Sequence, residues 1–255
     1  MRRKIISIAI ALTMTLAIGV NAFAVQKTDN FNQKLATITM NGTKLSNSAI
    51  IIGGTVYIPV RTVCEALGYK VTWSGADKQN KVTTTLDKAS VVLDIVNQKI
   101  TVNGEESKMM ADNAGAACII ENGTSYLKSA ILSKTYNVAV QYDEKNQAVT
   151  LTTCLKPDVK NTISVNDIAA VILAGNPTTG YDWHYKIGDE SIIKLNNETS
   201  IADSNLEGLV GAGETHEWFF TGLKAGETTI TFKYYRSWEG EGSATKTIVY
   251  KVEVK

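Results

Sequence analysis

Two copies of one unit constrain the first half of this chain more than any other feature of its sequence. The run ITMNG at 38–42 returns as ITVNG at 100–104, and GTVY at 54–57 returns as GTSY at 123–126. In each copy, alternating residues lead into an Asn-Gly pair, a pattern typical of a strand followed by a hairpin turn. The repeat therefore predicts two units of strand, hairpin, short helix and two strands, which together form a β-rich domain.

The two short helices are expected at Val60–Leu67 and Lys128–Thr135. In the first copy, the tract YIPVR followed by EALG resembles the copper amine oxidase N-terminal-like domain, or stalk domain, over about residues 37–153. The second copy departs from this pattern, because Leu127–Ala130 stands where Pro-x-Arg is expected. The resemblance implies a spacer or wall-associated module of secreted Gram-positive proteins, and the region has no His cluster for copper. We expect Arg61 to form a structural ion pair.

The N-terminus has the pattern of a secretory signal peptide. Met1–Lys4 is basic, Ile5–Val20 is uncharged, and AFA at 22–24 has the small-x-small pattern of a cleavage site. The uncharged run is shorter than the roughly 20 residues of a membrane-spanning helix. We therefore expect cleavage after Ala24, a linker over 25–36, and a mature chain that is secreted or held at the cell surface without a membrane anchor.

Charge and cysteine content exclude several classes of protein. The chain holds 26 Lys and Arg against 25 Asp and Glu, so we expect no basic surface for nucleic acid. Residues 25–157 carry a formal net charge of +3 and residues 158–255 one of −5, which favours two separate modules. Cys64, Cys118 and Cys154 allow either buried thiols or one disulfide, and their spacing matches no zinc site. We expect no metal and no cofactor.

Short alternating runs separated by turn signals fill the second half of the chain, after a boundary at Lys156–Asp158. They predict six or seven strands and an immunoglobulin-like β-sandwich, without the cysteine pair of antibody domains. The expected strands are Thr162–Val165, Ala169–Ala174, Asp182–Ile187, Glu217–Thr221, Thr228–Tyr234 and Thr247–Val254.

Three connections between these strands are candidate binding loops. The first loop, Asn176–Tyr181, is restrained by proline, turned by glycine and offers a hydroxyl at its tip. The second loop, Leu209–Glu214, combines two aliphatic residues with glycines that permit close approach of another surface. The third loop, Tyr235–Gly240, places Arg236 beside Trp238, residue types common in interface hot spots. In an immunoglobulin-like order the first and third loops lie at the same end, and the second can flank them.

The runs NPTTGYDWHY, LVGAGETHEWFF and YYRSWEG, in this order, resemble the chagasin family of cysteine-peptidase inhibitors over about Asn161–Lys255. The resemblance implies that the loops enter the active-site cleft of a papain-like peptidase and block it reversibly. The first loop would lie over the catalytic Cys–His pair, the second along the non-primed side and the third on the primed side. The peptidase-binding residues implied in this way are Asn176, Pro177, Thr178, Thr179, Gly180, Tyr181, Leu209, Val210, Gly211, Ala212, Gly213, Arg236 and Trp238.

Two residues depart from the family pattern. Ser237 replaces the Pro that members usually carry between Arg and Trp, so we expect a less rigid third loop. Glu214 stands where a second Gly is common, and its charge is expected to narrow the range of peptidases bound. We interpret His184 and His216 as strand-face residues. Because no nucleophile with an acid/base partner is visible, we expect no catalytic residues and no enzyme.

The sequence as a whole predicts a mainly β protein of two domains, a stalk domain over 37–155 and a chagasin-like domain over 156–255. We expect a secreted inhibitor whose partner is a papain-like cysteine peptidase, with a cell-wall component as a second partner of the stalk domain. The alternative hypothesis is an adhesion or wall-binding protein in which the sandwich binds a glycan or a host protein.

Overall fold

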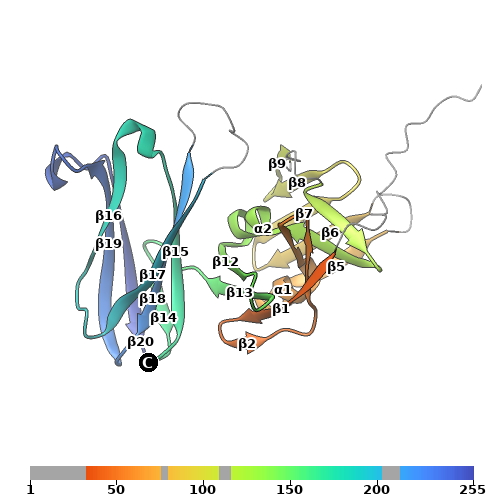
Figure 1. Ribbon diagram of the computed structural model, residues 1–255, viewed down its shortest axis with the longest axis horizontal. Coiled ribbons are helices and arrows are strands. Elements are labelled where there is room, and N and C mark those ends of the chain that lie inside the picture. Colours follow the sequence, from red (N-terminus) through yellow and green to blue (C-terminus); the bar gives the residue numbers. More distant parts are fainter. Residues whose placement is uncertain (1–32, 76–79, 109–115, 203–212) are drawn as a thin grey trace, which may run out of the picture.

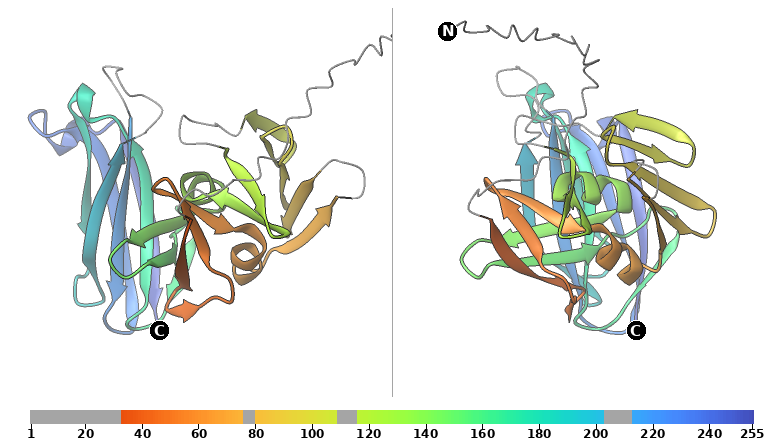
Figure 2. Two further views of the ribbon diagram at one scale, coloured as in Figure 1. Left: turned by 45° about the vertical axis from the view of Figure 1, so that its right-hand side comes forward. Right: turned by 90° about the vertical axis from the view of Figure 1, so that its right-hand side faces the viewer.

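The computed structural model describes residues 33–75, 80–108, 116–202 and 213–255, and these form two β-rich modules that lie side by side (Figures 1 and 2). The signal peptide expected at 1–24 and most of the linker expected at 25–36 lie outside the described residues. Within the described ranges, no helix has both the length and the apolar character needed to cross a membrane.

The first module holds two short helices and two sheets. The larger sheet has the strand order β10-β11-β4-β3-β1-β13-β12 with β2 paired to β1, and the smaller has the order β5-β6-β7-β8-β9. The larger sheet consists of β1 (Lys34–Met40), β2 (Thr43–Lys44), β3 (Ala49–Ile52), β4 (Thr55–Pro59), β10 (Cys118–Glu121), β11 (Thr124–Lys128), β12 (Val138–Asp143) and β13 (Ala148–Thr153). The smaller sheet consists of β5 (Lys70–Ser74), β6 (Lys81–Leu86), β7 (Ala89–Asp94), β8 (Lys99–Val102) and β9 (Glu105–Lys108). The helices are α1 (Val60–Ala66) and α2 (Ser129–Tyr136).

The two units of the repeat have the same order of elements, as the sequence predicts. The Asn-Gly pairs that follow β1 and β8 have positive φ at both positions, 46° and 79° in the first and 51° and 88° in the second, so each forms a tight turn. The units meet where β4 pairs with β11, with Ile58 opposite Leu127 and both side chains fully buried. Arg61 forms the expected ion pair, 3.1 Å from Glu65, and also donates to the carbonyl of Val71.

All three cysteines are free thiols. Cys64 and Cys118 lie in the core of the first module, and Cys154 lies where the two modules meet. Burial raises the pKa of each thiol to about 12, so all three stay protonated at neutral pH. Of the two possibilities that the sequence allows, the structure therefore has buried thiols rather than a disulfide.

The second module is a sandwich of a three-stranded sheet, β15-β18-β17, and a four-stranded sheet, β14-β20-β19-β16. Its strands are β14 (Lys160–Ile163), β15 (Ile168–Gly175), β16 (Tyr181–Ile187), β17 (Ile193–Ala202), β18 (Glu214–Gly222), β19 (Gly226–Arg236) and β20 (Lys246–Val254), with short 3-10 turns η1 (Pro177–Thr179) and η3 (Glu241–Ser243). Six strands overlap those expected from the sequence. The seventh, β17, was missed because this edge strand is mostly polar and carries a bulge between Leu195 and Asn197.

Aromatic side chains fill the space between the two sheets of the sandwich. Phe232 on β19 is fully buried, and its ring centroid lies 4.8 Å from that of Trp218 on the opposite sheet. Phe220 and Tyr250 contact the same ring edge-on, with centroids 6.3 Å and 5.9 Å away. Such pairs add to the stabilisation from buried area, so this cluster fixes the two sheets, and the loops between them, relative to each other.

Candidate functional site

The sandwich topology brings the three candidate loops to one end of the second module. The first loop joins β15 to β16, the second joins β17 to β18, and the third joins β19 to β20. The β15–β16 and β19–β20 connections lie beside each other, away from the C-terminus (Figures 1 and 2). Glu214 pairs with both Gly175 and Ala202, so the second loop leaves its sheet at this same end, which we call the loop end. Leu209–Ala212, which the sequence assigns to the site, lie outside the described residues.

The first loop is a 3-10 turn closed by its own hydrogen bonds. Thr178 Oγ1 donates to Asn176 Oδ1 at 2.6 Å, and Thr179 Oγ1 donates to the carbonyl of Asn176 at 2.7 Å. The amide of Gly180 donates to the carbonyl of Pro177 at 2.9 Å. Both threonine hydroxyls are therefore used inside the loop, so what the exposed tip presents is a fixed backbone rather than the free hydroxyl that the sequence suggests.

The sandwich supports this loop from below. The amide of Asn176 donates to the hydroxyl oxygen of Tyr234 at 2.9 Å, and the ring of Tyr234 stacks on that of Tyr181 with centroids 5.4 Å apart. Tyr234 in turn packs against Trp183, with ring centroids 4.8 Å apart. The base of the first loop is thus tied to the aromatic core, a contact that sequence reasoning did not reveal.

Gly180 fits its position for two separate reasons. Its φ is 76°, in the left-handed region that side chains other than glycine rarely adopt. In addition, a Cβ built on Gly180 would lie 2.2 Å from the indole of Trp238. The Trp238 ring therefore covers Gly180 directly, while 70% of the Trp238 surface remains exposed.

Arg236 connects the first and third loops. Its guanidinium carbon lies 4.6 Å from the ring centroid of Tyr181 and 5.9 Å from that of Trp238, distances typical of cation–π contacts. Its Nε donates to the carbonyl of Thr179 at 3.2 Å. Besides any contact with a partner, Arg236 thus positions two loops inside this protein.

The third loop is closed despite the absence of proline at Ser237. The amide of Glu239 donates to the carbonyl of Arg236 at 2.9 Å, and the Glu239 carboxylate pairs with the Arg236 Nη1 at 3.0 Å. Gly240 continues the turn with a φ of 78°. The replacement of Pro by Ser237 led us to expect a less rigid third loop, but this hydrogen bond and the ion pair restrain it. The spacing of three residues between Arg236 and Glu239 could have indicated this ion pair in the sequence, although oppositely charged residues at such spacing are common on protein surfaces.

Both histidines lie on strand faces, as the sequence predicts. The His216 ring stacks on Trp218 with centroids 5.4 Å apart and contacts the carboxylate of Glu214 at the base of the second loop. The ring of His184 stacks on Tyr235 with centroids 4.1 Å apart. Among the described residues, no group of three His, Cys, Asp or Glu side chains could hold a metal ion.

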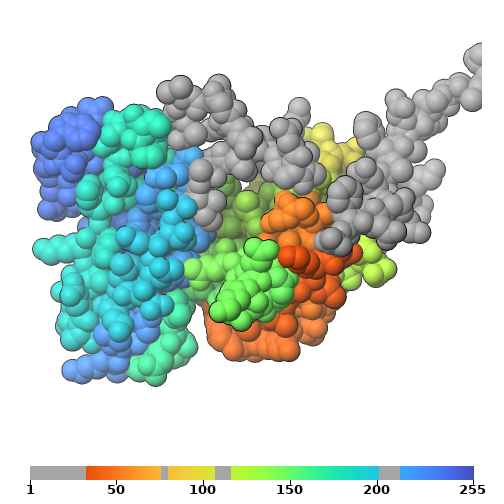
Figure 3. Space-filling view, in the orientation of Figure 1, coloured from red at the N-terminus to blue at the C-terminus, as the bar shows by residue number. Residues whose placement is uncertain are grey.

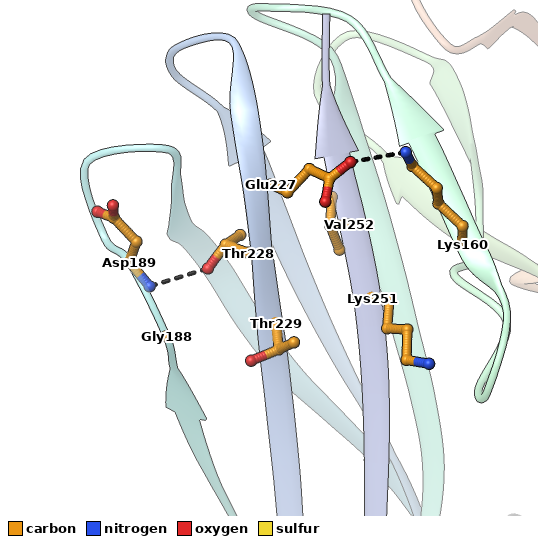
Figure 4. Close-up of a pocket in the computed structure, with 8 residues that line it drawn as sticks. All are labelled: Lys160, Gly188, Asp189, Glu227, Thr228, Thr229, Lys251 and Val252. Atoms are coloured by element: carbon orange, nitrogen blue, oxygen red, sulfur yellow. Dashed lines mark hydrogen bonds and ion pairs between the residues drawn. The ribbon is translucent and has the colours of Figure 1, made fainter.

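A shallow hollow lies near the opposite end of the sandwich from the loops (Figure 4). Lys160 Nζ there pairs with Glu227 at 2.7 Å and with Glu253 at 3.0 Å, and the amide of Asp189 donates to Thr228 Oγ1 at 2.8 Å. Several of the polar groups in the hollow therefore bond one another. The loop end remains the better candidate site.

Comparison with known families and proteins agrees with this geometry. Residues 162–252 match the chagasin family peptidase inhibitor I42, and residues 39–151 match the copper amine oxidase N-terminal domain. Amoebiasin-2 of Entamoeba histolytica is 32% identical over 93 residues, which cover 36% of this chain and 75% of amoebiasin-2. Chagasin of Trypanosoma cruzi is 32% identical over 84 residues, which cover 31% of this chain and 74% of chagasin.

A solved structure is also similar to part of this chain. The crystal structure of the cysteine protease inhibitor EhICP2 from Entamoeba histolytica is 30% identical and covers 40% of this chain and 94% of that chain, with a TM-score of 0.37. Both resemblances read from the sequence are confirmed, and the second module is an inhibitor domain rather than an enzyme. Through this module, preceded by a copper amine oxidase N-terminal domain, the chain belongs to the chagasin family of peptidase inhibitors.

Proposed function

We propose that this protein is a secreted inhibitor of papain-like cysteine peptidases that blocks the active-site cleft reversibly with the three loops. The observation that carries this proposal is the pre-ordered pair of first and third loops, which Arg236 and Gly180 hold against each other at one exposed end. Loops that are already ordered lose little entropy on binding, so more of the contact energy contributes to affinity. The description of EhICP2 as a cysteine protease inhibitor supports the same target class.

The shape of the first loop supports occlusion rather than cleavage. Peptide-bond cleavage requires the scissile carbonyl to align with the nucleophile in a near-attack geometry. Pro177–Thr179 instead form a 3-10 turn, and internal hydrogen bonds hold that turn closed. The loop thus fills space in front of a nucleophile without offering it an extended peptide.

The exposed indole of Trp238 supplies the apolar contact that this binding mode needs. Trp and Arg are the residue types that most often dominate interface energies, and they do so when a partner excludes water from them. At 70% exposure in the free protein, Trp238 has most of its surface available for burial. The base of the second loop, at Gly213 and Glu214, lies at the same end and extends the contact surface.

Secretion forms part of the proposal and rests on the first 24 residues. The basic start, the uncharged run and the small residues at 22–24 have the order of a cleaved signal peptide. Fractionation of the producing cells tests this part, because secretion requires a product in the medium or at the surface that begins after Ala24.

We expect the mature chain, residues 25–255, to inhibit papain and a cathepsin-type enzyme reversibly, with an inhibition constant in roughly the nanomolar range, as for standard inhibitor interfaces. The test is a titration of each peptidase with the purified chain, with a serine peptidase as the control. The full mature chain is used because Leu155, just before the boundary expected from the sequence, packs into the sandwich core. Equal inhibition of the serine enzyme, or inhibition of neither class, would contradict the proposal.

The exposed tip of the first loop gives a sharper test. Thr178→Arg places a long charged side chain where the loop would face the catalytic residues, so we expect inhibition to weaken at least a hundredfold. The matched control is Thr229→Arg, the same change at an exposed threonine that lines the hollow near the other end of the sandwich (Figure 4). Both variants should unfold thermally within a few degrees of the wild type, since surface substitutions usually change stability little. Unchanged inhibition by Thr178→Arg would remove the first loop from the binding surface.

Gly180→Ala tests the contact between the first and third loops. The methyl group must displace the Trp238 ring, and the backbone must bear the cost of positive φ, about 1 kcal/mol or more. We expect inhibition to weaken about tenfold or more. Gly242→Ala is the control, because a Cβ there meets nothing within 4 Å. Equal inhibition by the two variants would show that the position of Trp238 does not matter for binding.

A further inference from the structure

The first module covers the middle of one face of the inhibitor sandwich. Phe219 on β18 and Ala170 on β15 form a buried cluster with Ala139 on β12, so the centre of the outer face of the three-stranded sheet is covered, while the edge strand β17 stays exposed at Lys194 and Thr199. Figures 1 and 3 show the two modules in contact along this side. The chain also crosses between the modules here, because Cys154 pairs with Ala170 and the amide of Leu155 donates to the Ala170 carbonyl at 2.8 Å.

An acidic residue, Glu217, is buried at this interface. It lies two residues before Phe219 on β18, and alternation along a strand places both on the face that the first module covers. Glu217 is only 2% exposed, and its Oε2 has no hydrogen-bond partner. Burying a carboxylate oxygen that accepts no hydrogen bond is unfavourable when the group is ionised, whereas the protonated acid is tolerated far better.

The groups that face Glu217 offer it no counter-charge. Its cross-strand neighbours are Ile172 on β15 and Thr199 on β17, and in the first module the thiol of Cys154 lies close enough to interact with its charge. Burial keeps that thiol neutral by raising its pKa to about 12. Among the described residues of the neighbouring strands, the charged side chain of Lys194 lies on the same outer face. Lys194 is exposed, and it pairs with Thr221, which is four residues after Glu217 on β18.

We propose that the proton on Glu217 controls how tightly the two modules dock. The protonated carboxyl is compatible with the apolar interface, and the ionised form favours separation of the modules, which would return it to water. The proposal concerns the arrangement of the two modules and does not rest on the inhibitory function of the loops.

The direction of the pH dependence follows from linkage. Burial raises the pKa of Glu217 from its usual 4.5 to about 7, so the docked state holds its proton more tightly than the separated state. Docking is therefore strongest below about pH 4.5, weakens as the pH rises to about 7, and changes little above that. This difference in pKa between the separated and the docked state lowers the docking constant by roughly two orders of magnitude from about pH 4.5 to about pH 7.

The thiol of Cys154 provides a reporter of separation within the native sequence. We would treat the mature chain with N-ethylmaleimide at pH 5.5, 7.0 and 8.5 and measure alkylation of each cysteine by peptide mass spectrometry. Glu217→Gln serves as the matched variant, since it keeps the shape of the side chain but cannot ionise. Cys118, buried in the core of the first module, is the internal control for unfolding of the whole module.

The expected result is that the ratio of the Cys154 labelling rate in the wild type to that in Glu217→Gln rises at least tenfold from pH 5.5 to pH 8.5, because docking of the wild type continues to weaken until the pH reaches about 7. Taking the ratio of wild type to Glu217→Gln cancels the ordinary increase of thiol reactivity with pH. The direct charge effect works in the opposite direction, because an ionised Glu217 raises the pKa of Cys154 and slows its reaction.

Three results would overturn the proposal. One is a ratio that stays constant with pH. Another is a Cys154 that is labelled more slowly in the wild type than in Glu217→Gln at pH 8.5. The third is a Cys118 labelling rate that rises with pH in parallel with that of Cys154. If Glu217→Gln does not fold, the ratio of Cys154 to Cys118 labelling in the wild type takes the place of the variant. The proposal then requires that ratio to rise at least tenfold from pH 5.5 to 8.5.

Discussion

Burial of Phe232 between the two sheets of the sandwich is the contact on which the rest of the second module depends. Trp218, Phe220 and Tyr250 pack around this ring and hold strands from both sheets at fixed spacing. Because the first and third loops are the ends of strands in these sheets, the same core sets the distance between them. Tyr234, two residues after Phe232, links this core to the first loop, because its hydroxyl oxygen accepts a hydrogen bond from the amide of Asn176. The first and third loops are thus held in place by the core beneath them.

A few non-covalent contacts fix the first and third loops relative to each other. Arg236 lies against two aromatic rings and bonds a backbone carbonyl of the first loop, while its own loop is closed by Glu239. The side chains of this ion pair are 36% and 37% exposed, so the pair contributes little to stability in water. Its main effect is to fix the geometry of the third loop. Trp238 is held over Gly180 yet remains mostly exposed. Pre-ordered apolar surface of this kind suits reversible binding in a cleft.

Much of the fold could be predicted from the sequence because its signals are local. The Asn-Gly turns, both short helices, six strands of the sandwich and the order of the three loops follow from neighbouring residues. Strand β17 did not follow, because a polar edge strand lacks the alternation that identifies buried strands. The partners of Arg236 and Tyr234 are tertiary contacts, which spacing cannot show. Glu217 has the position of a solvent-facing residue in an alternating strand, and only the docked first module explains its burial.

The central claim is that ordered loops fill a peptidase cleft without reacting with its nucleophile. The most direct measurement is calorimetric titration of the mature chain into papain whose catalytic cysteine carries a small S-methylthio cap. Non-covalent occlusion predicts binding of the capped enzyme with an affinity within about tenfold of that for active papain, and recovery of the chain uncleaved. Loss of binding to the capped enzyme, or recovery of a chain cut within Asn176–Tyr181, would contradict this account.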